Sequence, residues 1–73
     1  MTTNNIRAIR ETQGISRVDL AFMSGVSEPM LKVLESGEYD IMKSKLDTLV
    51  KIATALKVKV LDLLPVEKRK LFK

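Results

Sequence analysis

The sequence predicts an all-α fold, arranged as a single compact domain of about five short helices. The chain has 73 residues and no cysteine, so its modest core must form without disulfides, which favours local helical packing. Apolar residues recur at the three- and four-residue spacings of amphipathic helices, most clearly over residues 46–56. Serines that can cap a helix start and glycines that can follow a helix end separate these stretches. We expect the domain to occupy residues 5–64, with a frayed N-terminus at 1–4 and a basic tail at 65–73 that is either helical or disordered.

The first helix is expected to be capped by Asn4 or Asn5 and to end near Gly14. Asparagine favours the N-cap position, and glycine favours the position after the last helical residue. Ile15 follows directly and is expected to be buried in the corner before the next helix. The apolar residues expected on one side of the first helix are Ile6, Ala8 and Ile9.

Residues 16–37 are predicted to contain two short helices joined by a tight turn. Ser16 can accept a hydrogen bond from a backbone N–H of the first turn, and Asp19 stands three residues on, as in a capping box. Gly25 should end this helix because glycine readily adopts the positive φ common after a helix, and Ser27 is placed to cap the next one. The residues expected in the core or at the helix crossing are Leu20, Ala21, Met23, Val26, Leu31 and Leu34.

A fourth helix is expected to begin at Ser44, with Asp47 completing a second Ser-x-x-Asp start. A short fifth helix over 58–64 would close the core through Leu61 and Leu64 before Pro65 interrupts the path. The tail beyond it would pack on the core, pair two chains or stay disordered. The apolar face of the fourth helix comprises Leu46, Leu49, Val50, Ala53 and Leu56, and the lysines expected to be exposed are Lys45, Lys51 and Lys57.

These elements together resemble the helix-turn-helix of the Cro/cI-type (XRE, lambda-repressor-like) DNA-binding domains. The helix-turn-helix lies at about residues 16–36, and the resemblance extends over about residues 5–64. The signal is the ordered spacing of a small residue, a turn glycine and a second N-cap, since no one residue is diagnostic. The residues that match are Leu20, Ala21, Gly25, Val26, Ser27, Leu31, Leu34, Glu35, Gly37, Leu46, Leu49, Ile52, Ala53, Leu56 and Val58.

The resemblance implies a small transcriptional regulator of bacterial or phage type that places the helix 27–35 in the major groove of double-stranded DNA. It also implies a partly buried ion pair between Arg10 and Glu35. Because one such domain reads few base pairs, a homodimer or a partner is expected. The implied DNA-contacting residues are Glu28, Pro29, Met30, Lys32 and Val33 at the bases, Ser16, Arg17, Ser36 and the loop to Lys43 at the backbone, and Ser27 at the helix start.

The side chains of this helix leave a second interpretation open. Bidentate bonds to guanine or adenine come from arginine, lysine, asparagine or glutamine, and only Lys32 belongs to that set. Glu28 can accept from cytosine, and Met30 or Val33 can pack against a thymine methyl. Met30 and Val33 also suit a protein partner. The alternative is therefore a helix-turn-helix scaffold that engages another transcriptional regulator, as a modulator or antirepressor does.

Composition argues against catalysis. The chain has no histidine and no cysteine, which removes the usual proton shuttle at neutral pH and the commonest soft metal ligands. We therefore expect no enzyme, no catalytic residue, no metal site and no cofactor.

Thirteen Lys and Arg against nine Asp and Glu give a net charge of +4, which favours a polyanionic partner. No apolar run reaches the ~20 residues that span a bilayer, and no signal segment is recognisable, so we expect a cytoplasmic protein with no membrane partner.

Overall fold

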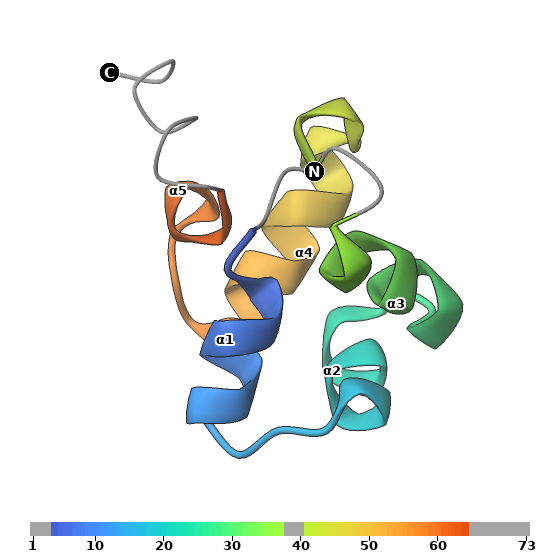
Figure 1. Ribbon diagram of the computed structural model, residues 1–73, viewed down its shortest axis with the longest axis vertical. Coiled ribbons are helices and arrows are strands. Elements are labelled where there is room, and N and C mark those ends of the chain that lie inside the picture. Colours follow the sequence, from blue (N-terminus) through green and yellow to red (C-terminus); the bar gives the residue numbers. More distant parts are fainter. Residues whose placement is uncertain (1–3, 38–40, 65–73) are drawn as a thin grey trace.

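The computed structural model describes residues 4–37 and 41–64, and this part of the chain is entirely helical apart from its turns (Figure 1). The predicted all-α fold of about five helices is confirmed. The expected frayed start at 1–3, the loop tip at 38–40 and the basic tail at 65–73 lie outside the described residues. The elements are α1 (Ile6–Thr12), α2 (Arg17–Ser24), α3 (Glu28–Ser36), the 3-10 turn η1 (Ile41–Lys43), α4 (Leu46–Leu56) and α5 (Val60–Leu63).

Helix α4 is the centre of the fold, with α2 and α3 on one side of it and α5 on the other (Figure 1). Its buried residues face a core to which every helix contributes, as the removal of apolar surface from water requires in so small a domain. The predicted core positions on α2, α3 and α4 are confirmed except where noted below. The fully buried large side chains are Ile6, Leu20, Leu31, Leu34, Ile41, Ile52, Leu56, Leu63 and Leu64.

The serine caps at the starts of α2 and α3 and the glycine at the end of α2 are confirmed. The backbone N–H of Asp19 donates to Ser16 Oγ at 3.0 Å, and that of Met30 donates to Ser27 Oγ at 3.3 Å. Gly25 has a φ of +76°, and its N–H donates to the carbonyl of Ala21 at 2.9 Å, which closes the end of α2. Glycine is the residue that adopts this backbone conformation without a steric penalty, so the turn can reverse the chain within three residues.

The expected fraying does not extend to Asn4. This side chain is buried: its Nδ2 donates to the carbonyl of Leu34, and its Oδ1 accepts the N–H of Ile6 at 3.0 Å. Asn5 is the N-cap residue, so Asn4 satisfies the first N–H of α1 from one position before the cap, and it also ties the start of α1 to the last turn of α3. Asn5 makes no capping bond, and its Nδ2 donates instead to the carbonyls of Asp62 at 3.2 Å and Leu64 at 3.4 Å.

Several apolar residues expected to face the core are exposed. Met23 on α2 is 50% exposed, and Leu46 and Val50 on α4 are 67% and 43% exposed. Helical spacing indicates the direction of an apolar stripe but not its width, and the neighbouring helices are too short to cover a wide one. Leu61 is 36% exposed, and its place in the core is taken by Leu63. Ile15 is half-buried rather than buried.

The predicted start of α4 is also wrong by one residue and in its cap. Lys45 is the N-cap residue and makes no side-chain capping bond. Ser44 Oγ is buried and has no hydrogen-bond partner among the described residues. The segment η1 sets the chain's approach to α4, because the N–H of Ser44 donates to the carbonyl of Ile41 at 3.0 Å. That turn places Ser44 before the helix rather than at its cap.

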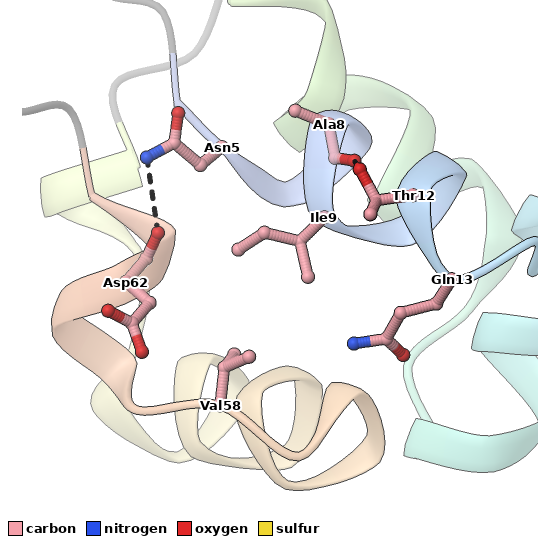
Figure 2. Close-up of a pocket in the computed structure, with 7 residues that line it drawn as sticks. All are labelled: Asn5, Ala8, Ile9, Thr12, Gln13, Val58 and Asp62. Carbon is pink, nitrogen blue, oxygen red and sulfur yellow. Dashed lines mark hydrogen bonds between the residues drawn. The ribbon is translucent and has the colours of Figure 1, made fainter.

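A pocket of about 390 Å³ lies between α1 and the segment that joins α4 to α5 (Figure 2). Ile9 and Val58 point toward each other across it, and the polar groups at its edge bond to the protein's own backbone. Gln13 Nε2 donates to the carbonyl of Leu56 at 2.7 Å, and Asn5 closes the other end of the pocket. These contacts fasten α1 to α4 and α5.

Candidate nucleic-acid interface

Helix α3 presents one face to the core and the other to solvent. Leu31 and Leu34 are fully buried, and a helical turn of about 100° per residue then directs Pro29, Lys32 and Val33 outward. All three are exposed in the structure. The exposed face is therefore the one expected from the sequence, with apolar side chains and a single cation.

The exposed apolar part of this face lies in the first two turns of α3. Met30 is 47% exposed and Val33 is 46% exposed, so each keeps about half of its surface open to a partner. Glu28 is half-buried at the first helical position, where a carboxylate complements the positive end of the helix. Pro29 occupies the next position, where a missing N–H leaves no intrahelical bond unmade.

An open groove of about 670 Å³ runs between α3 and the start of α4. One wall is formed by the apolar residues of α3 and the other by η1 and the first residues of α4. The two charged side chains that line it, Lys43 and Lys45, are both exposed cations. Ser44 and Thr48 line this groove but were not predicted as site residues. The spacing could have indicated Thr48, because it lies three residues after Lys45, almost one helical turn. The lining residues are Ser27, Pro29, Met30, Val33, Lys43, Ser44, Lys45 and Thr48.

The last turn of α3 is fixed by the ion pair between Arg10 and Glu35, which is present as expected. Arg10 Nε donates to Glu35 Oε2 at 2.8 Å, and Nη2 donates to Oε1 at 3.0 Å, so the pair is bidentate. The side chains are only 9% and 3% exposed. Arg10 Nη1 also donates to the carbonyl of Ile15 at 2.8 Å. The hydrogen bonds to Glu35 raise the pKa of Arg10 above its ordinary value, because they favour the charged form.

Arg17, expected at the DNA backbone, lies beside the same carboxylate. Its Nε is 3.6 Å from Glu35 Oε1, close enough for an ion pair but too long for a hydrogen bond. That nitrogen is buried and has no hydrogen-bond partner in the described structure. The side chain as a whole is 32% exposed. Glu35 thus holds two arginines, and part of the Arg17 side chain remains open to solvent at the start of α2.

The serines expected at the DNA interface already form hydrogen bonds within the protein. Ser16 and Ser27 accept the capping bonds described above, and Ser36 Oγ donates to the carbonyl of Val33 at 2.7 Å. The hydroxyl hydrogens of Ser16 and Ser27 are not used by these caps, so each can still donate to an anion. All three serines are exposed.

Residues 6–63 match the family model of a helix-turn-helix domain, the Cro/cI-type (XRE) class. This span is most of the chain and contains every helix of the described structure. The protein therefore belongs to the Cro/cI-type helix-turn-helix family, whose members are DNA-binding domains. A comparison with curated proteins gives no match.

Two features are absent from residues 4–37 and 41–64. No helix there has the length and apolar character needed to cross a membrane. No three carboxylates or other suitable side chains in that part are grouped so that they would hold a metal ion.

Proposed function

We propose that this protein is a transcriptional regulator of bacterial or phage type that binds double-stranded DNA in the cytoplasm with α3 in the major groove. The main support for the proposal is that α3 is fixed in place on one side and exposed on the other. Its inner face is buried, its last turn is held by Asn4 and Arg10, and its outer face is open from Pro29 to Val33. A rigid exposed helix after a tight turn is the arrangement by which such domains enter the groove.

Cations lie near both ends of α3: Arg17 is beside Glu35 in its last turn, and Lys43 and Lys45 line the groove along its first turns. Arg17 lies at the start of α2, and Lys43 and Lys45 lie across the groove at the start of α4. Phosphate contacts supply most of the affinity and fix the register of a domain on DNA, while the residues between them meet the bases. In this arrangement Lys32 and Val33 would face the base edges. A homodimer on adjacent half-sites would supply the length of site that one domain lacks.

The second candidate function is binding to another transcriptional regulator, as a modulator or antirepressor. It is favoured by the half-exposed Met30 and Val33, which form an apolar spot of the kind that anchors protein partners. In that case Lys32 would alter mainly the rate of association, because rim charges steer encounters more than they hold complexes.

A mobility shift with random-sequence duplexes, first at low and then at physiological salt, tests the proposal. DNA binding predicts that Lys32→Glu abolishes the shift, while Arg17→Ala weakens binding and lowers the salt slope by about one unit. Val33→Asp should then be the milder change. Loss of a protein complex in Val33→Asp, with no duplex bound by the wild-type chain at low salt, would instead establish the second function.

A further inference from the structure

We propose that the apolar face of α3 reads the 5-methyl groups of pyrimidines, so that the duplexes this domain selects place thymine methyls against Met30 and Val33. The inference rests on the proposed DNA binding and adds the chemistry by which the site discriminates among duplexes.

Hydrogen-bond donors are scarce where the bases would lie. Among the residues exposed on the first two turns of α3, Lys32 is the one with side-chain donors. Ser27 accepts a helix-capping bond and keeps one hydroxyl donor, but a serine hydroxyl bonds to several bases and does not distinguish guanine from adenine, and Ser44 Oγ is buried within the groove wall. Guanine and adenine are distinguished by bidentate donors, and this face offers no amide or guanidinium group to provide them. Discrimination by hydrogen bonding is therefore limited to one lysine.

Apolar surface is plentiful at the same place. Met30 and Val33 keep 47% and 46% of their surface exposed, and Pro29 adjoins them along the groove. The thymine methyl is the one apolar group that an unmodified base pair presents in the major groove. Burying it against these side chains removes apolar surface from water on both sides of the contact, which is the interaction this face can make.

The charges around the groove favour a nucleic acid over an apolar peptide as the occupant. Both charged residues that line it are lysines, Lys43 and Lys45, and Lys32 is exposed on the adjoining face. A duplex places a row of phosphates on either side of the base edges, so cations at the rim and apolar groups at the floor match its cross-section. A neutral apolar segment would match the floor but would offer no negative charge to Lys32 or Lys45.

The test uses the full chain and a duplex selected by it from a random pool. Each thymidine of that duplex is replaced in turn by deoxyuridine, which lacks the 5-methyl group but keeps the same base pairing. We expect about fourfold weaker binding at each contacted position, the value for about 0.8 kcal/mol per buried methyl. Replacing cytosine by 5-methylcytosine at such a position should strengthen binding relative to cytosine itself.

The variant Val33→Ala identifies the protein side of the contact. It removes two methyl groups from an exposed position, so folding should be unchanged, and it should abolish the deoxyuridine effect at one position of the site. Lys32→Ala is the matched control, because it should weaken binding to the thymidine and deoxyuridine duplexes equally.

The outcomes separate this inference from the proposed function. If the chain binds a selected duplex and deoxyuridine changes nothing at any position, methyl readout is wrong and DNA binding stands. If the chain binds no duplex at low salt, both the proposed function and methyl readout are wrong. A deoxyuridine effect that persists in Val33→Ala and in Met30→Ala would also overturn the assignment of these two side chains.

Discussion

Loss of Glu35 should destabilise the protein more than loss of its ion-pair partner Arg10. Glu35→Met removes the carboxylate that pairs with both arginines and leaves Arg10, 9% exposed, as a buried charge without its hydrogen-bonded counter-ion. Breaking a buried pair in this way costs about 3–5 kcal/mol. Arg10→Met leaves Glu35 with a second cation, since Arg17 Nε lies 3.6 Å away. We expect that variant to lose only about 2 kcal/mol.

The measurement is urea unfolding at neutral pH, followed by circular dichroism. A domain of this length has a total stability on the order of 5 kcal/mol, so Glu35→Met should keep about 0–2 kcal/mol and begin to unfold at the lowest urea concentrations, whereas Arg10→Met should still show a complete cooperative transition. The double variant Arg10→Met/Glu35→Met should refold, because replacing a buried ion pair by apolar groups of similar size is often neutral. Its midpoint should lie above that of Glu35→Met.

The surface pair of Arg7 and Glu11 is the matched control. It also joins an arginine to a glutamate, at 3.2 Å, but its side chains are 65% and 55% exposed. Arg7→Met should change stability by less than about 0.5 kcal/mol. The reasoning is refuted if Arg10→Met and Glu35→Met destabilise equally, or if the losses in the single variants add in the double variant.

Three further changes test the backbone and the surface, each by the urea midpoint. Gly25→Ala should destabilise by about 1–2 kcal/mol, because φ is +76° there and a Cβ would meet no neighbour, so the penalty is that of the backbone alone; an unchanged midpoint would contradict this. Lys57→Gly should stabilise the protein by about 0.5–1 kcal/mol, since Lys57 has a φ of +59° at the end of α4, which is unfavourable for a residue with a Cβ. A loss of stability would show that this backbone strain is not significant. Phe22→Ser should change stability by less than about 0.5 kcal/mol because Phe22 is 90% exposed, and a larger loss would show that the ring is packed.

The features that could be predicted from the sequence are those set by a few neighbouring residues. Ser16, Ser27 and Gly25 act through backbone groups two to four residues away, so the turn between α2 and α3 follows from local chemistry. The buried face of α3 follows from the spacing of Leu31 and Leu34. These local rules also place the exposed face of α3, where the candidate site lies.

The features that could not be predicted depend on segments distant in the sequence. Asn4 is buried because the carbonyl of Leu34, thirty residues away, accepts its amide. Ile41 in η1 is buried in the core, whereas Leu46 at the start of α4 is exposed. Spacing along one helix carries no information on how far its neighbours extend, so the width of a buried face is decided by packing.

Arg17 shows how such distant packing bears on function. The family resemblance implies a phosphate contact for Arg17, and the side chain is 32% exposed. The structure adds that Glu35 of α3 already attracts its guanidinium. A phosphate would therefore have to share Arg17 with a carboxylate that also holds Arg10. Glu35 pairs with both Arg10 and Arg17, and Arg17 Nε makes no hydrogen bond among the described residues. Arg17 can therefore turn toward an anion, while the pair of Arg10 and Glu35 keeps the last turn of α3 in place.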